Sequence, residues 1–127
     1  MKLGVVGSRS FKDYKILVEI LGRINDKFSI SEIISGGAKG ADLLGKRYAE
    51  ESEIVYTEFL PEWDKYGKSA GFKRNRLIVK ESDFLVAFWD GKSLGTKSSI
   101  NLAKKKKIPI VIYDFKKGKT CFVNANI

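Results

Sequence analysis

The sequence contains no histidine, one cysteine and two prolines among its 127 residues. Without histidine, a Ser-His-Asp triad and a histidine-containing zinc site are excluded. Acid–base chemistry near neutral pH would therefore need a carboxylate, lysine, tyrosine or cysteine with a shifted pKa, or a group of the ligand. The single cysteine, Cys121, cannot form an internal disulfide, which fits a reducing cytoplasm. We expect no metal site and no resident cofactor.

Long apolar runs and the common nucleotide-binding motifs are also missing. No apolar stretch approaches the roughly 20 residues of a membrane span, and MKLGVVGSRS is too short and too rich in glycine for a signal peptide. The motif GxGxxG does not occur. Residues Gly40–Lys46 have the GxxxxGK spacing of a P-loop, but Arg47 stands where Ser or Thr is required. We therefore expect no membrane partner, no dinucleotide fingerprint and no P-loop.

Basic residues are in clear excess, with 24 Lys+Arg against 15 Asp+Glu and a net charge of +9. This excess indicates attraction to polyanions or to small anionic ligands. It is equally typical of a solvated lysine surface that keeps a protein soluble. The length and a hydrophobic content of 43% predict a single domain over residues 1–127 that buries its own core.

Strand-like and helix-like segments alternate along the chain. Strands are expected at Leu3–Val6, Ile33–Ile34, Glu53–Phe59, Asp83–Trp89 and Ile108–Tyr113, with Thr120–Val123 a candidate for one more at the C-terminus. Helices are expected from Asp13 to Phe28, Ala41 to Glu51, Ala70 to Glu81 and Thr96 to Lys107, and a loop from Leu60 to Ser69. The alternation predicts an α/β fold with three layers, in which helices cover both faces of a mostly parallel five-stranded sheet of order 3-2-1-4-5.

Apolar spacing predicts which helix faces are buried. The first helix has apolar residues at three- and four-residue intervals, ending at Phe28. In the third helix we expect Leu77, Ile78 and Phe72 to point inward. The lysine run Lys104–Lys107 closes the fourth helix and is interpreted as cations at the negative end of that helix's own dipole.

Three short polar loops that contain glycine should meet at one edge of this sheet. In the expected order, the loops after the first, second and fourth strands are neighbours: Gly7–Ser10, Gly36–Asp42 and Asp90–Thr96. The second loop runs straight into a helix, so free backbone N–H groups and the positive end of the helix dipole face one point. Gly36 and Gly37 have no Cβ to hold a ligand away. The sequence therefore predicts an anion site over the Gly36–Gly40 turn.

For several charged and polar residues near these loops, the sequence is consistent both with ligand binding and with a purely structural role. Arg9 suits bidentate binding of phosphate or carboxylate, or is a surface residue. Asp42 accepts hydrogen bonds from ribose hydroxyls or holds the loop, or is an ordinary first-turn carboxylate. Arg74 and Asn75 lie early in a helix, where a second phosphate or a loop contact would explain an arginine better than burial in the core.

Other candidates have equally plain alternatives. Trp63 and Tyr66 stack on a base or pack in the core. Asp90 either contacts the ligand or starts a turn, and Thr96 either contacts the ligand or caps a helix. Gly7 lines the site or marks a tight strand exit.

Four ordered segments, GSRSF, SGGAKGAD, PEWDKYGKSAGFKRN and AFWDGKSLGT, resemble the YspA-like branch of the SLOG superfamily. The resemblance extends from Val5 to about Ile112 and implies a Rossmann-like fold. Relatives include cytokinin-activating phosphoribohydrolases, a DNA-processing protein that acts on single strands, and sensor domains for NAD-derived nucleotides. The resemblance also implies that the first ligand loop is formed by Gly36, Gly37, Gly40 and Asp42, and that the chain forms a homo-oligomer.

One motif departs from the phosphoribohydrolases, which carry PGGxGTxxE where this chain has Asp90, Gly91, Ser93, Gly95 and Thr96. The paired PGG is missing and Ser99 stands in place of the glutamate, which argues against that hydrolase activity. The predicted ligand-binding residues are Gly7, Ser8, Arg9, Gly36, Gly37, Ala38, Gly40, Asp42, Trp63, Arg74, Asn75, Asp90, Gly91, Ser93, Gly95 and Thr96.

The favoured hypothesis is a cytoplasmic module, such as a sensor, that binds a nucleotide or a nucleotide-derived ligand: NAD or ADP-ribose-like, or a nucleoside phosphate. The first alternative is an enzyme that hydrolyses an N-glycosidic bond with Asp42 or Asp90. The second is single-stranded nucleic-acid binding, in which Trp63, Tyr66 and Phe72 stack among Lys65, Lys68 and Lys73.

Overall fold

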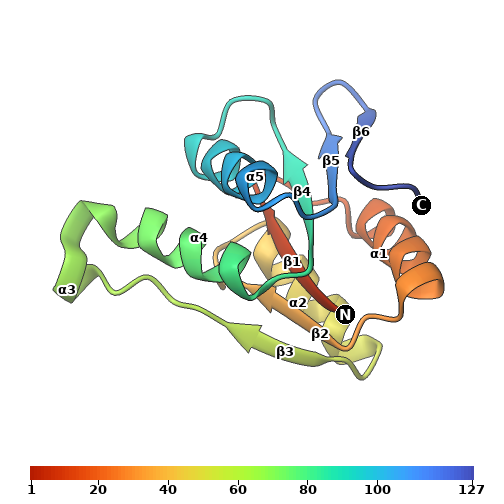
Figure 1. Cartoon of the computed structure of the whole chain (residues 1–127), viewed down its shortest axis with the longest axis horizontal. Coiled ribbons are helices and arrows are strands. Elements are labelled where there is room, and N and C mark those ends of the chain that lie inside the picture. The colour runs from red at the N-terminus through yellow and green to blue at the C-terminus, as the bar shows by residue number, and fades with distance from the viewer.

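The structure, a computed structural model that describes residues 1–127, is built on one six-stranded sheet (Figure 1). The strands are β1 (Lys2–Gly7), β2 (Glu32–Ser35), β3 (Val55–Glu58), β4 (Phe84–Trp89), β5 (Ile110–Asp114) and β6 (Lys119–Val123). The helices are α1 (Tyr14–Phe28), α2 (Ala41–Glu51), α3 (Trp63–Tyr66), η1 (Gly67–Ser69), α4 (Ala70–Glu81) and α5 (Leu94–Lys106). The strand order is β3-β2-β1-β4-β5-β6. The first five strands are parallel and β6 is antiparallel to β5, so the predicted Rossmann-like order, with one added strand, is confirmed.

Helices cover both faces of the sheet because strand residues point alternately to the two sides. One core cluster joins Leu3 and Val5 of β1 to α1 and α2, and includes Leu17, Leu21 and Tyr48. The other joins Val6 and its neighbours to α4 and α5, and includes Ile78, Val79, Ile100 and Ala103. β4 has residues in both clusters, as its nearly continuous apolar sequence predicts.

α1 begins and packs largely as its sequence predicts. Asp13 is the N-cap, and its Oδ1 accepts a hydrogen bond from the Ile16 N–H at 3.1 Å. The predicted buried face is correct up to Ile24, but Phe28 at the end of the helix is exposed. Its ring still packs against Phe84, with ring centroids 5.5 Å apart. Phe28 therefore continues the apolar face of α1 but lies at the margin of the core.

Within the predicted loop at residues 60–69, the structure is helical from Trp63 onward, with α3 followed by the single turn η1. These turns and the first part of α4 project beyond the sheet in Figure 1, and we call Trp63–Arg74 the arm. The prediction that Phe72 and Leu77 point inward is wrong, because both are exposed. Phe72 lies on the arm, beyond the core, and the buried stripe of α4 follows Asn75, Ile78 and Val79 instead.

One lysine of the run Lys104–Lys107 acts on a different helix from the predicted one. Lys106 Nζ donates to the carbonyl oxygens of Val79, Lys80 and Ser82 at 3.0, 2.7 and 2.7 Å. Because these carbonyls close α4, a cation from α5 neutralises the negative end of its neighbour.

Two further observations concern membrane-spanning helices and metal-binding clusters. None of the helices combines the length and the apolar character needed to cross a bilayer. No three Cys, Asp or Glu side chains come together in a way that suits a metal ion.

Candidate functional site

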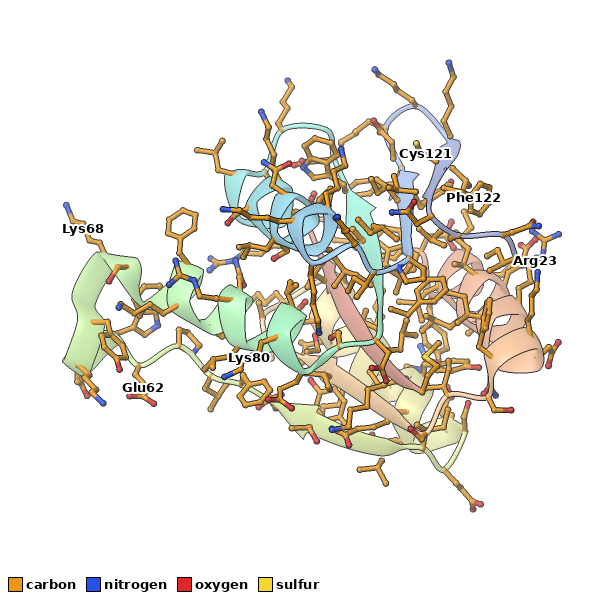
Figure 2. All side chains as sticks on the ribbon, in the orientation of Figure 1. Arg23, Glu62, Lys68, Lys80, Cys121 and Phe122 are labelled. Atoms are coloured by element: carbon orange, nitrogen blue, oxygen red, sulfur yellow. The ribbon has the colours of Figure 1, made fainter.

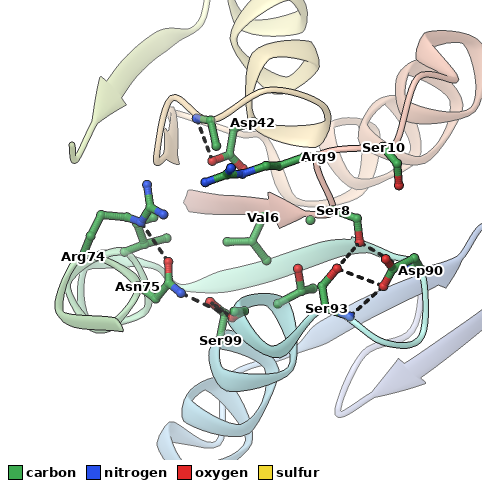
Figure 3. Close-up of a pocket in the computed structure, with 15 residues that line it drawn as sticks. Val6, Ser8, Arg9, Ser10, Asp42, Arg74, Asn75, Asp90, Ser93 and Ser99 are labelled. Carbon is green, nitrogen blue, oxygen red and sulfur yellow. Dashed lines mark hydrogen bonds between the residues drawn. The ribbon is translucent and has the colours of Figure 1, made fainter. Parts of the chain in front are cut away.

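A cavity of about 430 Å³ opens at the carboxyl edge of the sheet, where the loops after β1 and β4 meet the starts of α2 and α5 (Figure 3). This volume lies within the range of small-molecule sites. The lining is mostly polar, and its hydrophobic residues are Val6, Ala38 and Ile78. The three predicted loops therefore do converge, and α4 adds a fourth wall.

A serine pair joins the loops after β1 and β4. The Asp90 N–H donates to Ser8 Oγ at 3.0 Å, and Ser8 Oγ lies 3.0 Å from Ser93 Oγ. Because the Ser93 hydroxyl donates to Asp90 Oδ1 at 2.9 Å, the Ser8 hydroxyl is the donor between the two serines. These bonds fix the spacing of the two loops at one end of the cavity.

Asp90 organises the loop that enters α5. Its Oδ1 accepts bonds from the Lys92 and Ser93 N–H groups, both at 2.8 Å, besides the Ser93 hydroxyl. The bond from the Ser93 N–H is the main reason why the pKa of Asp90 falls to about 2. Asp90 is therefore a turn former that stays ionised and has one oxygen fully engaged.

The start of α5 forms one wall of the cavity. Ser93 is its N-cap but makes no capping bond with its side chain, since its hydroxyl is used by Asp90. The alternative that Thr96 caps the helix is wrong: Thr96 lies in the first turn, buried and lining the cavity. An uncapped helix start presents free N–H groups and a partial positive charge.

The glycine turn after β2 serves the protein's own packing more than the cavity. Arg74 Nη1 donates to the Gly36 carbonyl oxygen at 2.9 Å, and a Cβ on Gly36 would collide with that guanidinium. Gly40 has φ +81° and lies against the backbone carbonyls of Ser8 and Arg9, so only glycine fits there. From this turn and the start of α2, Ala38 and Asp42 line the cavity. Protein atoms thus occupy the Cβ positions of Gly36, Gly37 and Gly40, and Ala38 is the residue of this turn that lines the cavity.

Asp42 is a buried carboxylate in the wall of the cavity, 6% exposed. Burial raises its pKa to about 6, although the Ala38 N–H bond to Oδ2 at 3.2 Å and the charge of Arg74 lower it. Asp42 can therefore accept hydrogen bonds from hydroxyl groups, and it exchanges a proton close to neutral pH.

Two arginines approach Asp42 from opposite sides (Figure 3). Arg74 is held in place, because its Nε donates to Asn75 Oδ1 at 2.9 Å and Asn75 Nδ2 donates to the Gly95 carbonyl oxygen at 3.3 Å. Burial lowers the pKa of Arg74, and the charge of Arg9 adds to this effect. Arg9 is exposed, and its side chain makes no hydrogen bond or ion pair within the protein. One end of the cavity thus combines two guanidinium groups with a buried acid.

The structure brings most of the predicted site residues together. Those that line the cavity are Gly7, Ser8, Arg9, Ala38, Asp42, Arg74, Asn75, Asp90, Ser93, Gly95 and Thr96. Gly36, Gly37, Gly40, Trp63 and Gly91 do not line it. A Cβ on Gly37 would lie 2.6 Å from Glu58 Cδ, and one on Gly91 would lie 3.3 Å from Asp114 Oδ2.

Trp63 differs most from its predicted position. It is 53% exposed and lies on the arm, where its ring faces Gly71 of α4. No aromatic side chain lines this cavity, so a nucleobase would not find the expected Trp63 or Tyr66 ring within it.

Four lining residues were not predicted: Val6, Ser10, Ile78 and Ser99. Ser99 follows Gly95 by one helical turn, and its hydroxyl donates to the Gly95 carbonyl oxygen at 3.3 Å. Its place on the same face of α5 is the signal that would have identified it. Val6 and Ile78 carry no such signal, because apolar core residues look alike in sequence.

Comparison with known proteins supports a family assignment. A family model described as YspA, cpYpsA-related SLOG family matches residues 1–66. Gene 61 protein of Mycobacterium phage D29 is 32% identical, with 84% of this chain and 91% of that protein covered.

A solved structure of DNA processing protein A from Helicobacter pylori, studied for its mode of single-stranded DNA binding, shares the fold. The TM-score is 0.69 at 23% identity, over 88% of this chain and 64% of that one. The chain therefore spans less than two thirds of that protein's length. The matching fold, the match over residues 1–66 and the similarity to the phage protein lead to one conclusion: the chain belongs to the YspA, cpYpsA-related SLOG family.

Proposed function

We propose that the cavity binds a nucleotide or nucleotide-derived small molecule and recognises its ribose phosphate portion. The observation that carries this proposal is the end of the cavity where Arg9 and Arg74 flank Asp42. Guanidinium groups suit phosphate oxygens, and a buried carboxylate suits sugar hydroxyls. A simple anion site would not gain from Asp42, whose charge would repel the anion.

The α5 start and the serine pair complete the proposed site. The first turn of α5 adds backbone N–H donors opposite the arginines, where a second set of phosphate oxygens would fit. The hydroxyls of Ser8 and Ser93 already bond to each other and to Asp90, so they fix the shape of this wall.

Calorimetry with NAD, ADP-ribose, AMP and cyclic nucleotides tests the proposal. Arg9→Ala should weaken binding of the preferred ligand by about 10- to 100-fold, since a charged hydrogen bond contributes about 1.5–3 kcal/mol. Arg23→Ala is the matched control, because Arg23 is exposed on α1 (Figure 2) and does not line the cavity. No binding of any of these ligands, or equal loss in both variants, would contradict the proposal.

Hydrolysis of an N-glycosidic bond is the enzymatic alternative for the same cavity. In this alternative Asp42 would act as the general acid, since its pKa of about 6 suits a proton donor. Ser99 is not a carboxylate, and Asp90 Oδ1 is engaged by its own turn, so that only Oδ2 of Asp90 is free; we therefore expect bound nucleotides to be recovered intact. Chromatography after incubation at high protein concentration measures this, and release of free base would favour the enzyme.

Single-stranded nucleic-acid binding is the second candidate, and the arm favours it. The Tyr66 ring lies under Lys65 and Lys73, with Nζ-to-centroid distances of 5.1 and 4.5 Å. Trp63 and Phe72 beside it are 53% and 49% exposed. Figure 2 shows Lys68 pointing away from the body at the outer end of this arm. Exposed rings among lysines are typical of single-strand binders, and DNA processing protein A is described as binding single-stranded DNA.

Filter binding of a single-stranded oligonucleotide at two salt concentrations tests this candidate. Phe72→Ala should weaken binding by about 5- to 100-fold, as loss of one stacked base contact does. Phe122→Ala is the matched control, being 46% exposed on β6, away from the arm (Figure 2). Equal affinity of the two variants, or affinity that does not fall with salt, would exclude the arm as the binding surface.

The proposed setting is the cytoplasm, with the chain acting as a ligand sensor within a homo-oligomer. The exposed, unpaired thiol of Cys121 is what a reducing compartment permits. Light scattering should give the mass of two or more copies, and the mass of one chain would contradict the oligomer.

A further inference from the structure

A second cavity, of about 690 Å³, lies next to the first at the carboxyl ends of β4 and β5. It is lined by Trp89, Asp90, Gly91, Lys92, Asp114, Lys116 and Lys117. Asp90 belongs to both linings, so only the Asp90–Ser93 turn separates the two cavities. Figure 3 shows this turn at the end of the first cavity opposite Arg74.

Three lysines against the carboxylates of Asp90 and Asp114 give the lining of the second cavity a formal net charge of +1. Lys92, Lys116 and Lys117 have no carboxylate within ion-pair distance. The two acids in the lining are engaged by the backbone instead. Asp114 Oδ1 accepts from the Lys116 and Lys117 N–H groups at 3.0 and 3.1 Å, as Asp90 Oδ1 does from its own turn. The ammonium groups are therefore available to an anionic ligand.

The second cavity also has an aromatic surface, which the first lacks. Trp89 is partly exposed, and its Nε1 donates to the Ser93 carbonyl oxygen at 3.1 Å. This bond anchors the indole against the same turn that divides the cavities. A fixed, partly exposed ring beside cations suits a nucleobase.

We propose that the two cavities are subsites for one ligand, which carries two phosphates flanking a nucleoside, as a 5′-phosphorylated dinucleotide does. This inference rests on the proposed function. The first phosphate binds to Arg9 and Arg74, a ribose hydroxyl bonds to Asp42, and the nucleoside extends from there across the Asp90–Ser93 turn. The second phosphate binds among Lys92, Lys116 and Lys117, with the second base on Trp89.

Calorimetry with AMP, adenosine 3′,5′-bisphosphate and the dinucleotide pApA tests this arrangement at one fixed salt concentration. We expect pApA to bind at least tenfold more tightly than AMP. The double variant Lys116→Ala/Lys117→Ala should remove this gain and leave AMP affinity within twofold. Both side chains are exposed, and alanine keeps the N–H groups that bond Asp114, so the fold is preserved. Adenosine 3′,5′-bisphosphate separates the part of the gain that comes from the second phosphate.

Lys104→Ala/Lys105→Ala is the matched control, with the same loss of charge at the other end of α5. Equal binding of AMP and pApA by the wild type would overturn the two-subsite inference while leaving nucleotide binding intact. Equal loss in the two double variants would also overturn it, because general attraction to polyanions would then explain the gain. Binding of pApA but not AMP, with sensitivity to Lys116 and Lys117 alone, would support it. No binding of any probe would end both proposals.

Discussion

Asp42 is ionised at neutral pH at a cost to folding, because its pKa rises from 3.8 to about 6 in the folded chain. The native state holds a proton that the unfolded state has lost between these values, so stability falls as the pH rises from about 4 to 6. Asp42→Asn removes the charge and keeps an oxygen for the Ala38 N–H. At pH 7.5 the variant should be more stable by about 1–3 kcal/mol.

Urea denaturation at pH 4, 6 and 7.5 measures this difference, which should shrink toward zero at pH 4. A variant less stable than the wild type at pH 7.5 would show that hydrogen bonds to the carboxylate outweigh its burial. Proteins often keep such destabilising groups in binding sites, because a ligand makes use of them.

The two arginines of the site differ in what they do for the fold. Arg74 supports Gly36 and Asn75, whereas Arg9 makes no internal hydrogen bond or ion pair. Arg74→Ala should therefore lower the free energy of unfolding by about 1–3 kcal/mol, and Arg9→Ala by less than about 0.5. Thermal denaturation of the two variants compares them. Equal stability would mean that the Arg74 bonds do not hold the glycine turn.

At the scale of elements, one side chain of α5 caps the end of α4. Lys106 of α5 donates three bonds to the carbonyls that end α4. Lys106→Met keeps the aliphatic stem and removes the charge, which should destabilise the protein by about 1–2 kcal/mol. Lys105→Met, an exposed neighbour on the same helix, should change stability by less than about 0.5 kcal/mol. Chemical denaturation distinguishes them, and a similar effect of both would argue against the cross-helix cap.

The pairing of α4 with α5 also matters for the site. Arg74, Asn75 and Ile78 reach the cavity from α4, while Gly95, Thr96 and Ser99 reach it from α5. A loosened helix pair would widen the cavity, so ligand affinity should fall with stability in Lys106→Met but not in Lys105→Met.

At the scale of the whole molecule, the C-terminal segment closes one edge of the sheet. β6 pairs with β5, Val123 packs against one core cluster, and Ala125 and Ile127 pack against the other. Deleting residues 119–127 should cost about 3–5 kcal/mol and expose the β5 edge, which favours aggregation.

Denaturation and light scattering of the shortened chain measure both effects. Ile127→Ala in the full chain gives a milder version, with an expected loss of about 1 kcal/mol or less for a partly buried side chain. Unchanged stability in both cases would mean that the last strand is dispensable.

The strand order follows from sequence because it depends on local pattern. Alternating strand and helix segments, each too short to bury itself, have few ways to pack, and chain handedness removes most of these. The same reasoning places loops after β1, β2 and β4 together, which is why Ser8, Asp42 and Ser93 could be assigned to one cavity. Periodicity also identified the buried face of α1.

The atoms that each loop presents to the cavity depend on contacts between distant segments of the chain. The glycines at 36, 37 and 40 look like a ligand cradle in sequence, yet they admit Arg74, Glu58 and the backbone after β1. Lys106 looks like a cap for its own helix, and Trp63 like a base platform beside the cavity. The position of each of these residues depends on its contacts with a distant segment of the chain. The periodicity of helices and strands carries no information about such contacts. Local sequence patterns suffice to place the loops at one edge of the sheet, whereas packing between distant segments sets which side chains face the cavity there.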